Sequence, residues 1–145
     1  MMDINRQTPA YYHTEIFITA PAEMVYETLA RLENWPEWQA DVKIISVPSE
    51  ILPEGIFRWT NAGMQITSRI LRADSPTRLE WISRSMWIRA HIRWEMEEGN
   101  GGTVVRFEQS IQGFGAVLLK PALVNSMETT LLELRKHVEL QAVLV

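Results

Sequence analysis

Residues 42–112 alternate between apolar and polar side chains with a period of two, and this run constrains the fold more than any other feature of the sequence. Turns and one loop rich in Gly, Pro, Asn and Asp divide the run into six segments, at 42–47, 56–60, 64–73, 78–83, 87–97 and 103–112. Consecutive strands joined by short connections pair antiparallel as a meander. With a further strand expected at 12–19, the pattern predicts a sheet of seven strands.

After Gly113 the period changes to 3.6, which predicts a long C-terminal helix. Pro121 is expected either to start the regular part of this helix or to kink it. Two short helices are expected after the first strand, one beginning near Pro21 and one around Trp35. The long helix must bury its apolar stripe against one face of the sheet. The predicted class is therefore α+β, a curved antiparallel sheet around the C-terminal helix, with a tapering space between them.

Composition narrows the class of protein. The 145 residues suit one domain, which we place at 11–145, after a polar N-terminal tail at 1–10 that we expect to be frayed. The chain has no cysteine, so it has no disulfide or thiolate metal site, and a cytoplasmic location fits. Its net charge of −4 argues against a nucleic-acid partner. No apolar run approaches the ~20 residues of a membrane span, so we expect no stable insertion into a membrane.

Strand alternation also selects the side chains that face the helix. The inward positions and the helix stripe together provide ten candidate ligand-binding residues, namely Trp59, Ile66, Ser68, Trp81, Ile92, Trp94, Phe107, Gln109, Leu123 and Met127. Taken singly, each apolar member can be explained as ordinary core packing. Gln109 is different, because a buried amide needs a partner, which could be Ser68, a trapped water or a ligand. Ligand pockets have this character, mostly apolar with a few placed polar groups.

Catalytic chemistry is not visible in the sequence. The carboxylates of the predicted sheet fall on outward positions or in turns, at Glu15, Glu80, Glu95 and Glu108. The three histidines are far apart in the sequence, and His91 is expected to face solvent, so no catalytic residue, metal site or cofactor is predicted. Other polar groups expected to face inward are Ser83, Asn61, Tyr26 and Thr130, which can orient a carbonyl but are poor proton shuttles. This favours binding over catalysis.

The outer face of the predicted sheet is rich in arginine. Six arginines fall there, at Arg58, Arg69, Arg84, Arg89, Arg93 and Arg106, beside Glu80, Glu95 and Glu108. They could form a patch for an anionic partner or a membrane surface. They could also form cross-strand charge pairs on a solvated face, which the acidic balance of the whole chain favours.

The joint order of several segments resembles the START-like, helix-grip superfamily, in its polyketide cyclase/dehydrase and lipid transport branch. The segments are ITAPAEMVY at 18–26, NWPEW at 34–38, GIFRW at 55–59, ITSRI at 66–70, PTRLEW at 76–81 and GTVV at 102–105, followed by Glu108, Ser110 and Gly113. The resemblance covers about residues 12–138. It implies a ligand cavity under the long helix. It implies no single activity, because cyclases, aromatases, lipid carriers and ligand sensors share this fold.

Three functions follow as hypotheses. The first is a protein that binds or carries an apolar molecule, lipid-like or polyketide-like, in the internal cavity. The second is an enzyme, a polyketide cyclase or aromatase, that uses the same cavity as a template for a flexible chain. The third is a regulatory protein that docks on a partner through the arginine-rich outer face. The sequence leaves a homodimer open.

Overall fold

The order of elements in the computed structural model, which describes residues 3–144, is a strand, two short helices, six strands and a long helix, as predicted, with one additional short 3-10 helix before the long helix. The strands are β1 (Ala10–Ile18), β2 (Val42–Ser46), β3 (Ile56–Asn61), β4 (Met64–Asp74), β5 (Arg78–Ser85), β6 (Ile88–Gly99) and β7 (Gly102–Gly113). The helices are α1 (Ala22–Ala30), the 3-10 helices η1 (Leu32–Glu37) and η2 (Ala116–Leu119), and α2 (Lys120–Leu144). The predicted α+β fold is confirmed.

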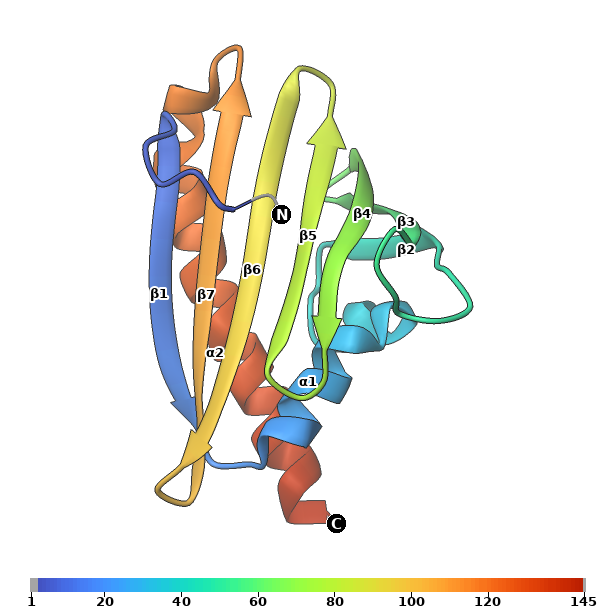
Figure 1. Cartoon of the computed structure of the whole chain (residues 1–145), viewed down its shortest axis with the longest axis vertical. Helices are drawn as coiled ribbons and strands as arrows, with labels where there is room; N and C mark the ends of the chain where they lie inside the picture. Colours follow the sequence, from blue (N-terminus) through green and yellow to red (C-terminus); the bar gives the residue numbers. More distant parts are fainter. Residues whose placement is uncertain (1–2, 145) are drawn as a thin grey trace.

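The seven strands form one antiparallel sheet in the order β1-β7-β6-β5-β4-β3-β2. Helices α1 and η1 carry the chain from one edge strand, β1, to the other, β2. The register shifts between Ile70 and Arg72 and between Ile44 and Ser46, and such bulges increase the twist of a sheet. Figure 1 shows the result: β2 and β3 run steeply across the other strands, and α2 lies behind the sheet. The concave face of the sheet therefore wraps around α2.

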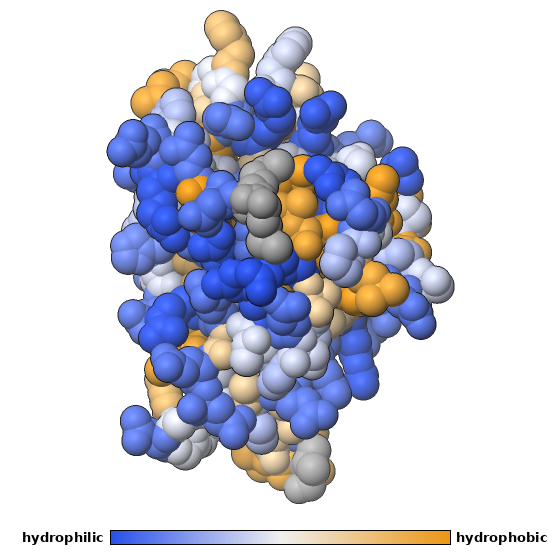
Figure 2. Space-filling model, in the orientation of Figure 1, coloured by the Kyte–Doolittle hydropathy of each residue, from blue (hydrophilic) through white to orange (hydrophobic). Residues whose placement is uncertain are grey.

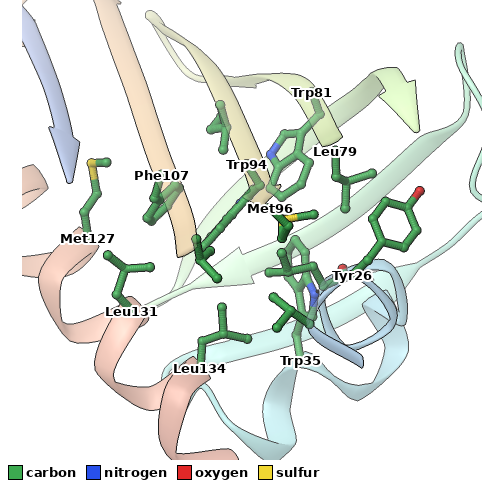
Figure 3. Packing of buried hydrophobic residues seen from close by; sticks show 14 of the residues in the cluster. Tyr26, Trp35, Leu79, Trp81, Trp94, Met96, Phe107, Met127, Leu131 and Leu134 are labelled. Atoms are coloured by element: carbon green, nitrogen blue, oxygen red, sulfur yellow. Dashed lines mark hydrogen bonds between the residues drawn. The ribbon is translucent and has the colours of Figure 1, made fainter. Parts of the chain in front are cut away.

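Helix α2 begins at Lys120, so Pro121 lies in its first turn and starts the regular helix. A proline is tolerated there because its missing N–H would have no partner inside the helix. Five residues of the stripe predicted from the sequence are buried in α2, at Leu123, Met127, Leu131, Leu134 and Val138. The first two predicted members, Ala116 and Leu119, belong to η2 instead, and Leu119 is exposed. Figure 3 shows Met127, Leu131 and Leu134 pointing from the helix toward Phe107 and Trp94 on the sheet. None of the helices in the described part of the chain is long and apolar enough to cross a membrane.

Helices α1 and η1 close one end of the space between sheet and α2. Pro21 precedes α1 in an extended conformation, and the carboxylate of Glu98 accepts a hydrogen bond from the Ala22 amide at the helix start, at 2.6 Å. In η1 the indole of Trp35 is buried and donates a hydrogen bond to the carbonyl of Leu29, at 3.0 Å. This bond fixes the Trp35 ring against the sheet.

The N-terminal segment differs from the frayed tail that was predicted for residues 1–10. Met1 and Met2 lie outside the described residues, whereas residues 3–9 cross the outer face of the sheet (Figure 1). Ile4 is buried, the Asp3 carboxylate lies 2.5 Å from the Arg93 guanidinium, and the Ser110 hydroxyl donates to the carbonyl of Asn5 at 2.6 Å. The segment is ordered by partners that lie about a hundred positions away, which local composition does not reveal.

Candidate ligand cavity

A cavity of about 370 Å³ lies between the concave face of the sheet, η1 and the first half of α2. Nine of the ten predicted residues line it: Trp59, Ile66, Trp81, Ile92, Trp94, Phe107, Gln109, Leu123 and Met127. The volume falls in the range of small-molecule sites, and the wall is mostly aromatic and aliphatic, as in such sites. That these residues contact a ligand remains a prediction.

Ser68 is the exception among the ten, because it lies behind the wall. Its short side chain is buried, accepts a hydrogen bond from Nε1 of Trp59 at 3.1 Å and lies 2.7 Å from the hydroxyl of Ser83. Ser83 does line the cavity, together with Asn61 and Thr130, whereas Tyr26 does not. Ser68 therefore holds the Trp59 ring in place and does not face a ligand.

Aromatic rings form the closed end of the cavity. Trp35 packs edge-on against Trp59 with centroids 5.1 Å apart, and lies 5.5 Å from Trp81. Trp94 and Phe107 stack with centroids 3.7 Å apart and their planes 12° from parallel. The strand alternation missed Trp35 and its neighbour Trp38, which also line the cavity, because both belong to the η1 region and not to the sheet. The feature of the sequence that could have indicated them is the pair of large apolar side chains in the segment NWPEW.

Some polar groups of the wall lack partners. The Gln109 amide has no hydrogen-bond partner among the described residues, and its cross-strand neighbours are Ile92 and Tyr12. The indole N–H groups of Trp38, Trp81 and Trp94 are also buried without an acceptor in the described part of the chain. A buried donor left unpaired costs about 1–3 kcal/mol. The wall therefore places a few unpaired hydrogen-bonding groups among apolar side chains.

Ionisable groups are nearly absent from the wall. Arg84, at the open end, is the one ionisable side chain among the lining residues, which contain no Asp, Glu or His. Within residues 3–144 no three His, Cys, Asp or Glu side chains come together as metal ligands. General acid–base catalysis needs a titratable group within hydrogen-bond reach of the substrate, and the wall does not provide one.

The histidine expected to face solvent is instead buried in a charge cluster on the outer face. His91 is 8% exposed and its Nε2 lies 2.5 Å from Glu80, which is 1% exposed. Arg93 donates to the same carboxylate at 3.1 Å. Burial would by itself raise the pKa of Glu80, but the hydrogen bonds with His91 and Arg93 outweigh burial and hold that pKa below its ordinary value of 4.5. His91 is buried because the N-terminal segment, through Asp3, reaches the Arg93 beside it.

This cluster cannot serve the cavity, because Glu80, His91 and Arg93 point to the opposite side of the sheet from their neighbours Trp81, Ile92 and Trp94. Charge pairs continue along the outer face, where Arg78 lies 2.9 Å from Glu95 and Arg106 lies 3.0 Å from Glu97. These more exposed pairs are the cross-strand charge pairs that were predicted for a solvated face.

The profile of the family described as polyketide cyclase / dehydrase and lipid transport matches residues 10–139. The chain belongs to this family. The match spans the whole sheet and α2 up to Glu139, and it confirms the START-like, helix-grip resemblance of the sequence segments. A search of curated proteins found no match.

Solved structures agree on the fold. A protein of Chromobacterium violaceum is 14% identical with a TM-score of 0.77, covering 91% of this chain and 99% of its own. A START superfamily protein of Mycobacterium smegmatis is 12% identical with a TM-score of 0.75, covering 90% and 98%. A protein of the dynemicin biosynthetic locus is 14% identical with a TM-score of 0.72, covering 89% of this chain and 47% of that one. At such identities the likeness concerns the fold and not the ligand.

Proposed function

We propose that this family member binds and carries an apolar small molecule, lipid-like or polyketide-like, in the cavity between sheet and α2. The observation that carries the proposal is the half-buried Gln109 amide, which lies on the mostly apolar wall and has no hydrogen-bond partner among the described residues. A half-buried amide without a protein partner is stabilised when a ligand oxygen pairs with it, so we expect the ligand to be mostly apolar and to carry a carbonyl or hydroxyl group.

The family description also includes cyclases and dehydrases, so an enzyme is the alternative. A cyclase could use the cavity as a template that holds a flexible chain in a reactive shape. The wall contains hydroxyl and amide groups for orientation but no carboxylate or imidazole to move a proton. This absence from the wall favours the carrier.

Mass spectrometry of the protein under native conditions is the direct test of the proposal. We expect a noncovalent molecule of low mass to copurify with the chain, and its accurate mass to match an apolar oxygen-bearing compound. Conversion of an added polyketide chain by the purified protein would instead support the cyclase.

Occupancy of the cavity can be measured with N-phenyl-1-naphthylamine, an uncharged apolar fluorophore. We expect one probe per chain. Ala122 lines the cavity from α2, so Ala122→Phe should narrow it and weaken binding by roughly tenfold, or about 1.4 kcal/mol. Thr129→Phe is the matched control, since Thr129 is exposed on the same helix and does not line the cavity. No saturable binding by the folded wild type would contradict a ligand cavity.

Gln109→Leu tests the polar anchor. The free energy of unfolding of the empty protein should stay equal or rise, because leucine removes a half-buried polar group that lacks a protein partner. Affinity for an oxygen-bearing ligand should fall by about 1–3 kcal/mol, while affinity for N-phenyl-1-naphthylamine should not. Wild-type affinity should be flat between about pH 5 and 8, because the one ionisable group on the wall is Arg84. An equal loss of affinity for both molecules would show that Gln109 acts through the shape of the cavity.

A further inference from the structure

Charge is distributed unevenly along this acidic chain. The segments 55–73, 81–94 and 109–127 contain no Asp or Glu, although the whole sequence has 18. The same segments contain seven of its 14 cationic residues. The other parts of the sequence therefore carry all of the negative charge.

The structure brings the ends of these three segments together around the cavity mouth. The mouth is the part of the wall whose residues are exposed, and these include Met64 in the β3–β4 hairpin, Arg84 in β5, and Leu119 and Ala122 beside the start of α2. Gly113, at the end of β7, packs so closely on the β5–β6 hairpin that a Cβ atom there would lie 2.1 Å from the carbonyl oxygen of Trp87. The two hairpins and the β7–η2 turn thus form one end of the molecule.

Large apolar side chains protrude from this end. Trp87 is 71% exposed and Phe114 is 87% exposed, and they are accompanied by Met64, Met86, Val117 and Leu118. Apolar residues stand out at the upper end in Figure 2, where Figure 1 shows the β5–β6 hairpin and the β7–η2 turn. Ser85 and Ile88, on either side of Met86 and Trp87, line the cavity, as does Leu119 next to Leu118. Several large apolar side chains that are exposed side by side next to a cavity mouth are typical of an interaction site.

Arginines without carboxylate partners lie next to these apolar residues. Arg84 and Arg89 are directly opposite each other in the β5–β6 ladder, and like charges in such positions repel. Arg58 of β3 belongs to the same cross-strand row, because it is opposite Thr67 of β4, and Thr67 is in turn opposite Arg84. Arg58, Arg84, Arg89 and Lys120 make no ion pair with any residue the structure describes, unlike Arg78 and Arg106 further along the sheet. The repulsion would be relieved by an anionic surface placed against this end.

We propose that this end of the molecule docks on the surface of an anionic phospholipid bilayer, and this goes beyond ligand binding in the cavity. Trp87 and Phe114 would lie at the depth of the lipid headgroups, where amphipathic and aromatic side chains gather. The free arginines would face the lipid phosphates, which attract basic residues. The cavity mouth would then open toward the source of an apolar ligand. Positive charge without neighbouring Asp or Glu in the sequence distinguishes this end from the exposed apolar residues near the C-terminus, Leu140, Val143 and Leu144, where Arg135 and Lys136 stand between Glu133 and Glu139.

Cosedimentation with lipid vesicles tests the docking proposal. The protein should bind vesicles of phosphatidylcholine mixed with phosphatidylglycerol, bind phosphatidylcholine alone weakly, and detach as salt is raised. Binding should shift tryptophan emission to shorter wavelength, and Trp87→Phe should remove most of this shift while the protein still sediments. A wild type that does not bind the anionic vesicles would overturn the proposal.

Charge and apolar variants locate the surface. Arg58→Glu with Arg89→Glu should lower partition to the anionic vesicles by roughly tenfold or more, as should Trp87→Ser with Phe114→Ser. Lys136→Glu and Leu144→Ser make the same kinds of change on exposed residues of α2 and should bind like wild type. Undiminished binding by the first two variants would refute the assignment. If the wild type is a dimer in solution and these variants are monomers that still bind the vesicles, this end is a dimer interface and not a membrane surface. Probe titration without vesicles reports on the cavity separately, and these variants should retain it.

Discussion

Replacing Glu80 with alanine is expected to lower the free energy of unfolding by about 3–5 kcal/mol. The Glu80 carboxylate lies inside the cluster on the outer face, 2.5 Å from Nε2 of His91 and 3.1 Å from Nε of Arg93. Its removal leaves the guanidinium of Arg93 buried with less compensation, since the remaining partners are Asp3, which is exposed, and Glu108, at 3.7 Å. A buried charge that loses its partner is far more costly than a lost surface pair.

Urea denaturation followed by fluorescence measures this loss. The matched control is Glu95→Ala, since Glu95 is paired with Arg78 at 2.9 Å on the same face but its side chain is 36% exposed. The control should lose no more than about 1 kcal/mol. If both variants lose the same amount, the cluster contributes no more than a solvated pair.

The same cluster predicts how stability depends on pH. The pKa of Glu80 is lower in the folded protein than its ordinary value of 4.5, so the ionised carboxylate contributes stability that is complete above the unfolded-state pKa. That contribution is lost as the pH falls through the folded-state pKa. Wild type should therefore lose free energy of unfolding as the pH falls below about 4.5, and the difference between wild type and Glu80→Gln should narrow over the same range. A constant difference would contradict the pKa shift.

Replacing Leu131 with alanine is the second change with a large expected effect, a loss of about 2–5 kcal/mol. Leu131 is 3% exposed and points from α2 toward the sheet, between Met127 and Leu134 (Figure 3). The truncation removes buried methyl groups and leaves a void, because the strands beneath the helix cannot fully close over it. Leu132→Ala is the matched control, since Leu132 is the next residue along the helix and is 52% exposed.

Thermal and urea denaturation of the two variants measure how much the packing of α2 on the sheet contributes to the free energy of unfolding. The control should change the free energy of unfolding by less than about 0.5 kcal/mol, as surface substitutions do. A similarly small loss for Leu131→Ala would mean that α2 is not packed on the sheet as described. Leu131 does not line the cavity, so affinity for N-phenyl-1-naphthylamine in the folded variant should stay close to that of wild type.

The alternation of residues 42–112 was sufficient to assign the two faces of the sheet. Trp94 and Ile92 face α2 while Arg93 and His91 face away, as the period of two requires. A slip of one residue would move the whole apolar set into water, so the burial of one face specifies the register. For this reason seven of the eight residues predicted from the strands are found on the cavity wall. The other two predicted residues, Leu123 and Met127, belong to the stripe of α2, which is buried as predicted.

Local pattern was not sufficient where a side chain is placed by contacts between distant parts of the chain. Ser68 has the right parity, but its hydrogen bond with Trp59 holds it behind the wall. His91 was expected in water, and it is buried by Glu80 and by the N-terminal segment. Trp35 reaches the cavity from η1, whose position depends on the curvature of the whole sheet.

The sequence by itself determined the class of fold, the inward faces and the lack of acid–base groups among them, because periodicity and burial act on neighbouring residues. Three stretches without carboxylates could also be read from it. Only the tertiary structure decided that the ends of these stretches meet at the cavity mouth, with Trp87, Phe114 and unpaired arginines on one surface. The physical reason is that β-hairpins and the start of a helix become neighbours through the curvature of the sheet, which the bulges and the packing of α2 set together.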